Sequence, residues 1–387
     1  MKLEFLGEAF WQGGKRIGAF LFGCKGLADL QNEQIFIWGT GELANRCVSY
    51  LIKNGLRVSR FCDNDKRHQN NTFLGLPITP PPPQSNLNAY FIICAQEWNL
   101  WLISRQLSVR YGDDFSFFFL REFGDFFDNR TLMDATLRSL NAMLQNEIIY
   151  GHKKVWHQFI EEATPGRVMQ LCQSTTHWDA TIKWLSEPNY TRPETMLDIG
   201  PGWGTLSYII NDLYGGVDTT WVCVSKKERW DDAYIDWENM QYPVKRIFGL
   251  IENPSFSISE RYDLIILTEV MEHFSCNPVS ILNKIREWLN HNGKFILSTP
   301  SPTAEPLRTF DSYKQLPKLS SFEYLPDEEY AAKNINLQKY LDPSNAHIHI
   351  YDRWELEEIF HECGLKVVKY ELNARLHHCY MLEADKK

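Results

Sequence analysis

Short apolar runs alternate with longer segments of helical periodicity in the first third of the chain. These patterns predict strands at residues 35–38, 58–62, 90–94 and 115–120, and helices at about 44–54 and 98–111. Strands that alternate with helices build parallel sheets, so residues 1–125 are predicted to form a small domain of about four strands. Repeated glycines among the first 30 residues indicate turns, and a hairpin fits them.

The same alternation returns in the last half of the chain. Strands are predicted at residues 195–199, 219–224, 244–248, 263–267, 294–298, 365–371 and 378–382. Helices are predicted between them at residues 204–213, 226–239, 278–290 and 352–363. Gly293 and Gly364 follow two of these helices, where glycine C-caps are expected. The order predicts an α/β fold with a seven-stranded, doubly wound sheet.

Two less regular segments accompany these domains. Residues 126–190 have helical apolar spacing and predict a helical linker with the opening helices of the second domain, which spans residues 191–387. Residues 302–346 form a long insertion after the fifth strand, and long loops at the ligand end of a sheet are often lids. Its aromatic side chains favour an acceptor pocket or the apolar side of a small helical subdomain. They include Phe310, Tyr313, Phe322, Tyr324 and Tyr330.

Composition narrows the classes of partner. Hydrophobic residues make up 44% and charged residues 23% of 387, which is ordinary for two globular domains. The net charge of −9, without a long Lys/Arg run, argues against nucleic acid. No apolar run reaches the length of a signal peptide or a membrane span. Nine cysteines without a C-x-x-C pair are typical of reduced thiols, which predicts a cytoplasmic protein without a membrane partner.

One glycine-rich segment carries the clearest chemistry. A predicted strand ends in Asp198, and Gly200, Gly202 and Gly204 then open a helix. Glycine is needed where a backbone turns sharply and a ligand approaches closely. The helix N-terminus offers free N–H groups to a polar ligand at the carboxyl ends of the strands. The spacing G-x-G-x-G differs from the G-x-G-x-x-G of dinucleotide sites.

This segment resembles the first motif of class I S-adenosylmethionine (SAM) dependent methyltransferases. Residues 262–274 and 289–300 resemble the fourth and fifth strands of the ubiquinone-biosynthesis O-methyltransferases, so the likeness extends over nearly 200 residues. It implies a seven-stranded sheet, SAM as cofactor and a small-molecule acceptor. It also implies cofactor contacts, which are Asp198, Gly200, Gly202 and Gly204 around the methionine part and Thr268 or Glu269 beside the sulfonium.

The chain departs from that family at two positions. Ser225 stands where an acid usually holds the ribose hydroxyls, and Leu250-Ile251 follow the third strand where an acid often lies near the adenine. Glu252 is the expected substitute for the second acid. Loss of charge-assisted hydrogen bonds of about 1.5–3 kcal/mol would weaken SAM binding roughly tenfold to a hundredfold.

Two histidine-containing motifs are candidates for catalysis. Glu272-His273 follows the fourth strand, and His347 and His349 precede the last helix. Histidine suits a general base because its ordinary pKa lies near neutrality. The alternative for each is a structural role in capping or in the core. The His347/His349 pair also fits a metal site, but no third ligand stands out in the sequence, so no metal is predicted.

The N-terminal domain has a motif of its own. Gly39-x-Gly41-x-x-Ala44 follows a strand, and Asp63 comes about 20 residues later, as in nucleotide-binding fingerprints. The region resembles the small Rossmann-like N-terminal domain of sugar-modifying acetyltransferases that hold a nucleotide sugar. The resemblance implies that Gly39, Gly41 and Asp63 line such a site. The alternative is a vestigial domain used for packing or for forming a homodimer.

The function predicted from these features is SAM-dependent methylation of a small molecule. An oxygen atom of a sugar or nucleotide-linked sugar is the expected acceptor, on the strength of the N-terminal resemblance. One alternative is a methyltransferase-like binding protein without turnover. Another is an NAD-type oxidoreductase acting through the N-terminal domain, against which the small size of that domain argues.

Overall fold

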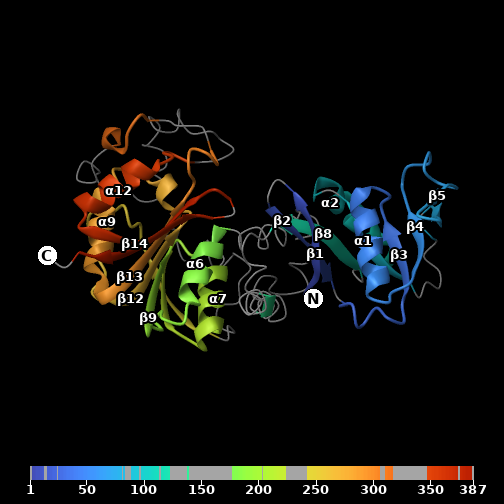
Figure 1. Cartoon of the computed structure of the whole chain (residues 1–387), viewed down its shortest axis with the longest axis horizontal. Coiled ribbons are helices and arrows are strands. Elements are labelled where there is room, and N and C mark those ends of the chain that lie inside the picture. The colour runs from blue at the N-terminus through green and yellow to red at the C-terminus, as the bar shows by residue number, and fades with distance from the viewer. Residues whose placement is uncertain are drawn as a thin grey trace. The chain divides into compact units, whose positions relative to one another are not determined.

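The computed structural model divides into two compact units, residues 1–175 and 176–387, shown in Figure 1. It describes residues 2–12, 15–23, 25–80, 82, 89–95, 97–112, 115–122, 137–138, 177–202, 204–223, 242–305, 310–316, 347–373 and 375–385. Most of the predicted linker, the predicted helix at 226–239 and most of the insertion at 302–346 therefore lie outside the described residues. None of the described helices is long and apolar enough to cross a membrane.

The first unit contains one mixed sheet in the order β1-β2-β8-β7-β3-β4-β6-β5. Its strands are β1 (Lys2–Gln12), β2 (Lys15–Gly23), β3 (Gln34–Trp38), β4 (Val58–Cys62), β5 (Thr72–Phe73), β6 (Leu76–Thr79), β7 (Ala89–Ile93) and β8 (Phe115–Glu122). Its helices are α1 (Glu42–Lys53) and α2 (Glu97–Tyr111). The five strands β8-β7-β3-β4-β6 are parallel, and all of them except β6 were predicted.

The predicted size of this first sheet was too small. The glycine-rich N-terminus forms the hairpin β1–β2, and β2 then pairs antiparallel with β8 from Ile17 to Gly23. Phe20 stacks on Phe119 with ring centroids 5.4 Å apart, which gives the added strands an apolar contact of their own. The sheet has eight strands in the described residues, not about four.

The second unit contains a sheet of seven described strands in the order β11-β10-β9-β12-β13-β15-β14. Its strands are β9 (Thr195–Ile199), β10 (Asp218–Cys223), β11 (Val244–Phe248), β12 (Tyr262–Thr268), β13 (Leu289–Thr299), β14 (Leu365–Leu372) and β15 (His378–Ala384). Its helices are α6 (Asp179–Leu185), α7 (Thr205–Tyr214), α9 (Val279–Glu287) and α12 (Arg353–Glu362), with 3-10 turns η4 (Met271–His273) and η5 (Tyr313–Gln315). Only β15 runs antiparallel to its neighbours in this sheet.

Helices cover both faces of the second sheet. Helices α9 and α12 lie on one face and α6 and α7 on the other (Figure 1). The inner strands are buried on both faces, which explains their nearly continuous apolar sequences. The strand order reverses between β9 and β12, so the carboxyl ends of these two strands flank the crevice where such sheets bind ligands.

One predicted helix C-cap is wrong. Gly293 lies inside β13, which begins at Leu289, and not after a helix. A Cβ on Gly293 would lie 2.8 Å from the backbone oxygen of Tyr262, so glycine is needed there for close strand contact. Gly364, with a φ of 63°, does follow α12 in the left-handed conformation expected of a C-cap residue.

Candidate functional site

The loop between β9 and α7 turns through three glycines with left-handed backbone. The φ angles of Gly200, Gly202 and Gly204 are 69°, 56° and 73°, values that residues with a Cβ rarely adopt. A Cβ on Gly200 would lie 2.7 Å from Val270 Cγ2, and one on Gly204 would lie 2.3 Å from the Trp221 ring. A Cβ on Gly202 would meet nothing within 4 Å. The loop is therefore packed at two points and open at the third, where a ligand can approach the backbone.

Asp198 supports this loop from the interior of the sheet. Its side chain is buried, and its carboxyl group accepts a hydrogen bond from Ser207 Oγ in α7. Trp221 Nε1 in β10 donates to the same Ser207 oxygen at 2.9 Å. Burial raises the pKa of Asp198 to about 7. The three side chains tie β9, α7 and β10 together, so the structure gives Asp198 a part in holding the loop in shape.

This raised pKa predicts how Asp198→Asn changes stability. The native state binds the Asp198 proton more tightly than the unfolded chain, so ionisation destabilises the wild type as pH rises from about 4 to about 7. Asparagine has no such penalty and can still accept from Ser207. From pH 5 to pH 8 we expect the stability of the variant relative to wild type to grow by roughly 2–3 kcal/mol. Urea unfolding at both pH values measures this, and a difference that is constant or shrinks with pH would contradict it.

The tip of β12 lies beside the glycine loop. Thr268 ends the strand, and Glu269, with a φ of 55°, begins the turn in which Val270 contacts Gly200. Glu269 Oε1 accepts from Ser298 Oγ at 2.7 Å, and Glu269 Oε2 lies 2.6 Å from His377 Nδ1. Burial alone would raise the pKa of Glu269, but the hydrogen bond and charge of His377 hold it below its usual value. This carboxylate is thus fixed at the edge where a cofactor on the glycine loop would lie.

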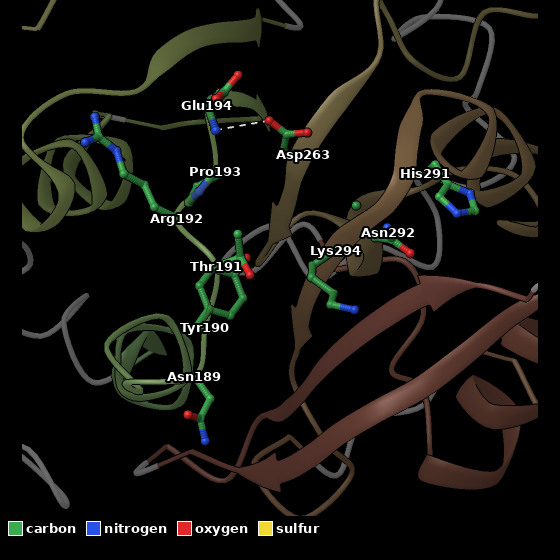
Figure 2. A pocket seen from close by; sticks show the side chains of 11 residues that line it. Asn189, Tyr190, Thr191, Arg192, Pro193, Glu194, Asp263, His291, Asn292 and Lys294 are labelled. Atoms are coloured by element: carbon green, nitrogen blue, oxygen red, sulfur yellow. Dashed lines mark hydrogen bonds between the residues drawn. The ribbon is translucent and has the colours of Figure 1, made fainter.

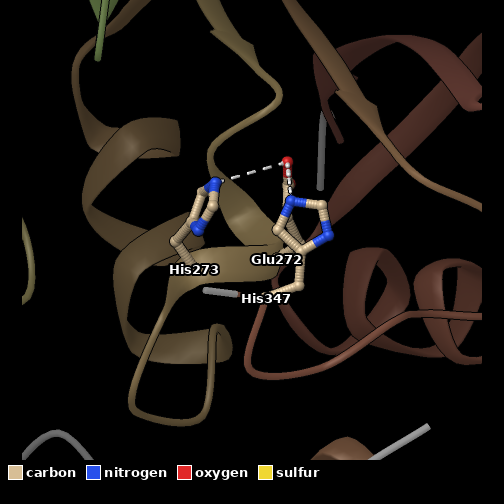
Figure 3. A group of neighbouring side chains, drawn as sticks. All are labelled: Glu272, His273 and His347. Atoms are coloured by element: carbon tan, nitrogen blue, oxygen red, sulfur yellow. Dashed lines mark ion pairs between the residues drawn. The ribbon is translucent and has the colours of Figure 1, made fainter. Parts of the chain in front are cut away.

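Glu272, His273 and His347 form a second group just beyond this turn (Figure 3). Glu272 Oε1 lies 3.8 Å from His273 Nε2 and 4.0 Å from His347 Nε2. Glu272 is buried, His347 is mostly buried, and the His273 side chain is 44% exposed. Thr299 Oγ1 donates to Glu272 Oε2 at 3.0 Å, and His347 Nδ1 lies 2.6 Å from Glu305 Oε2. The fold thus joins two of the predicted histidines and their neighbouring acid.

His349 has a different environment from His347. Its side chain is fully buried, with Nε2 3.4 Å from Glu355 Oε2 and its ring 4.6 Å from the Tyr351 ring. Glu355 also caps its own helix, because it forms a capping box with Asp352. The structure therefore brings the imidazole of His347, and not that of His349, to the Glu272 carboxyl group, although the His349 backbone N–H donates to the Glu272 carbonyl oxygen. A fully buried imidazole cannot reach the hydroxyl of an acceptor, so we assign His349 to the core.

Ser225, which replaces one expected acid, and Glu252, the predicted substitute for the other, have different outcomes. Ser225 lies outside the described residues. Glu252 is buried, and its Oε1 accepts from both the backbone N and the Oγ of Ser275 at 2.7 Å. These bonds fasten the loop after β11 to the segment that follows η4. A direct contact of Glu252 with an adenine stays a prediction.

The predicted nucleotide-binding residues of the first unit lie at the ends of β3 and β4. Gly39 has a φ of 115°, and a Cβ there would lie 2.4 Å from the carbonyl oxygen of Cys94. Gly41 is the N-cap residue of α1, and a Cβ there would meet nothing within 4 Å. Asp63 Oδ2 accepts from Thr40 Oγ1 at 2.8 Å, so the glycine loop is held to the end of β4.

A cavity of about 580 Å³ lies at the opposite edge of the second sheet (Figure 2). Residues 189–194, which precede β9, line it together with Asp263 and residues 291–294 of β13. Asp263 there accepts hydrogen bonds from the backbone N–H groups of Glu194 and Thr195. Parallel strands begin at this edge, whereas ligands of doubly wound sheets bind where the strands end. The cavity is therefore separate from the candidate site.

The sequence analysis did not identify His377 as a candidate residue. His377 precedes β15, and β15 runs antiparallel to β13. An antiparallel strand starts at the edge where its parallel neighbours end, so the strand order alone could have placed His377 beside Glu269. Glu305 had no comparable signal, because its contact with His347 joins two segments of irregular backbone.

Comparison with known proteins identifies a family for the second unit. A family model described as a methyltransferase domain matches residues 173–370. Similar solved structures include a SAM-dependent methyltransferase from Clostridium acetobutylicum ATCC 824 (14% identity, TM-score 0.39, covering 54% of this chain and 91% of that one). The CcbJ methyltransferase from Streptomyces caelestis is another (15% identity, TM-score 0.36, covering 54% and 89%). These structural likenesses are too distant to argue function, and none of the curated proteins matches the sequence.

The match to the family model is by itself sufficient to show the family. It spans more than half of the chain and contains the glycine loop, the tip of β12 and the Glu272–His273–His347 group. The chain therefore belongs to the family of methyltransferase domains, enzymes whose methyl donor is S-adenosylmethionine.

Proposed function

We propose that this enzyme methylates an oxygen atom of a small molecule, and that the acceptor is a sugar or a nucleotide-linked sugar. One observation supports the proposal of O-methylation. Gly200 of the glycine loop packs against Val270, which lies between Glu269 and Glu272 in the sequence. A loop suited to the methyl donor and a group of acids and histidines suited to a hydroxyl proton thus share one edge of the sheet.

The glycine loop fits the methionine end of SAM. The space above Gly202 is open. Thr205 Oγ1, at the first position of α7, is buried without a hydrogen-bond partner among the described residues. Free N–H groups at the start of α7 suit a carboxylate. When bound, SAM supplies an electrophilic methyl group, and Thr268 and Glu269 would border it.

Methylation of an alcohol requires a group that removes the hydroxyl proton. His273 is the exposed member of the Glu272–His273–His347 group, so it is the one that an acceptor can reach. Glu272 lies within 4.0 Å of both imidazoles and can stabilise a positive charge that develops there. Burial, and then the charge of Glu269, raise the pKa of Glu272 well above its usual value, so Glu272 is ionised only when a positive charge lies beside it. We assign proton removal to this group, with His273 in contact with the acceptor.

The proposal of a sugar acceptor is based on features of the first unit. Its parallel strands β3 and β4 end in the loop of Gly39 and Gly41 and in Asp63, the pattern that resembles nucleotide-sugar domains. The open backbone at Gly41 and the N-terminus of α1 suit a phosphate group. We assign to this unit the binding of a nucleotide sugar.

The test is an acceptor screen with the full chain. Purified enzyme is incubated with SAM and nucleotide sugars, free sugars and phenols in parallel, and mass spectrometry detects an added methyl group. We expect methylation of at least one nucleotide sugar, with stoichiometric release of S-adenosylhomocysteine. Methylation of phenols alone would refute the sugar acceptor. Binding of S-adenosylhomocysteine in calorimetry without any methylation would instead favour a binding protein.

A further inference from the structure

The Glu272 group presents three donor atoms to one point. Glu272 Oε1, His273 Nε2 and His347 Nε2 all lie within 4.8 Å of one another, and Figure 3 shows both imidazoles turned toward the carboxylate. The separations from Glu272 Oε1, 3.8 and 4.0 Å, are too long for hydrogen bonds. Small inward movements would give each donor a bond of about 2.0–2.2 Å to a single ion between them.

The side chains behind these donors fix their orientation. His347 Nδ1 lies 2.6 Å from Glu305 Oε2, and since a carboxylate accepts, a neutral His347 carries its proton on Nδ1 and its lone pair on Nε2, the atom that faces Glu272. Histidines that bind metals usually have their other nitrogen bonded in this way. Thr299 donates to Glu272 Oε2 and leaves Oε1 directed at the histidines. The backbone N–H of Ile348 donates to the Glu272 carbonyl oxygen at 2.7 Å, which holds the His347 segment against η4.

We propose that Glu272, His273 and His347 bind one divalent first-row transition-metal ion. A buried carboxylate needs a counter-charge, and a cation supplies it. Two imidazoles and one carboxylate suit ions of the zinc class better than Mg²⁺, which prefers oxygen ligands. Three protein ligands also leave a coordination position open, as in catalytic sites. The expectation from the sequence that no third ligand joins the histidines is thereby revised, because the fold brings Glu272 and His273 to His347.

A bound metal would also help to remove the proton of the acceptor hydroxyl. This role of the metal rests on the proposed function. An imidazole is a weak base for an alcohol, whereas a bound cation such as Zn²⁺ lowers the pKa of a coordinated water from 15.7 to about 7. With an ion bound, the Nε2 lone pairs of His273 and His347 would be used by the metal, so these residues would act as ligands rather than as the base. An acceptor hydroxyl at the open position would lose its proton to solvent water near neutral pH. Its oxygen then forms the bond to the methyl carbon as the sulfur–carbon bond breaks, and the electron pair of that bond stays on sulfur.

Metal binding can be measured without a methyl donor or an acceptor. The full chain is treated with EDTA, desalted and titrated with ZnCl₂ in a calorimeter, and Co²⁺ is added to a second sample for visible spectroscopy. We expect one Zn²⁺ per chain with a Kd of about 1 µM or lower. His347→Ala should weaken binding at least a hundredfold. Glu305→Gln, which keeps the ligands, should weaken it about 10–100-fold.

The control is His361→Ala, because His361 is an exposed histidine of α12 away from the group. Its affinity for Zn²⁺ should match the wild type, and circular dichroism verifies the fold of each variant. The proposal is overturned if the wild type shows no saturable binding, or if His361→Ala loses as much affinity as His347→Ala. Because no acceptor is present, the proposal can fail while the enzyme still methylates a sugar, and it can hold when no sugar is methylated.

Discussion

Alanine at Gly204 is expected to destabilise the methyltransferase unit by about 3 kcal/mol and to abolish binding of S-adenosylhomocysteine. The new Cβ would lie 2.3 Å from Trp221 Cη2 and 2.4 Å from Cζ2. The ring cannot easily move, because it is fully buried and its Nε1 donates to Ser207. Overpacking of a core costs about 1–3 kcal/mol, and a left-handed φ costs roughly 1–2 kcal/mol more. Urea unfolding and calorimetry with S-adenosylhomocysteine measure the two effects.

Gly202→Ala is the matched control for that variant. Gly202 has a similar φ of 56°, but a Cβ there would meet no atom within 4 Å. We expect only the cost of the φ, roughly 1–2 kcal/mol in stability. Affinity for S-adenosylhomocysteine should still fall, because the methyl group would project into the space that we assign to the ligand. Equal losses of stability in both variants would show that the contact with Trp221 is not the cause.

Replacement of His273 by alanine is expected to lower kcat by about 10²–10⁴-fold with little change in stability. The side chain is 44% exposed, so its removal leaves no large cavity in the core. Its Nε2 nevertheless lies 3.8 Å from the buried Glu272 carboxylate, within the group that we assign to proton removal. Methylation assays at saturating SAM, on whichever acceptor the screen identifies, give kcat.

Calorimetry with S-adenosylhomocysteine separates catalysis from cofactor binding in this variant. We expect its affinity to stay within about twofold of the wild type, since the glycine loop is untouched. His361→Ala serves again as the control and should leave both quantities unchanged. A kcat within about threefold of the wild type would remove His273 from the proposed mechanism.

The strands of the second unit were largely predictable from the sequence. Strands β9 and β11 occupy the predicted residues, and the other five differ by a few residues at their ends. Strands buried on both faces appear as apolar runs, and glycines mark where several of them end. The predicted helix C-cap at Gly293 was wrong because a glycine after a helix can either cap that helix or lie within the next strand. Gly293 follows a helix in sequence, yet strand pairing with β12 makes it part of β13.

The composition of the candidate site was only partly predictable. Asp198, the three glycines and Glu272-His273 lie within motifs that are continuous in sequence. The contacts of His347 with Glu305 and of His377 with Glu269 join residues far apart along the chain, so spacing could not reveal them. The hairpin β1–β2 was predicted, but its pairing with β8 was not, because partner choice between distant strands leaves no local pattern.

Strand β15 lies between β13 and β14, although it follows both in the chain. During synthesis on the ribosome, β13 and β14 therefore emerge without the strand that joins them, and each exposes an unpaired edge until β15 arrives. His377 follows Glu269 by 108 residues, so the Glu269–His377 contact can form only after that length of chain has been added. A nascent chain that stalls before residue 377 would contain the glycine loop and Glu269 but would lack the histidine that contacts Glu269.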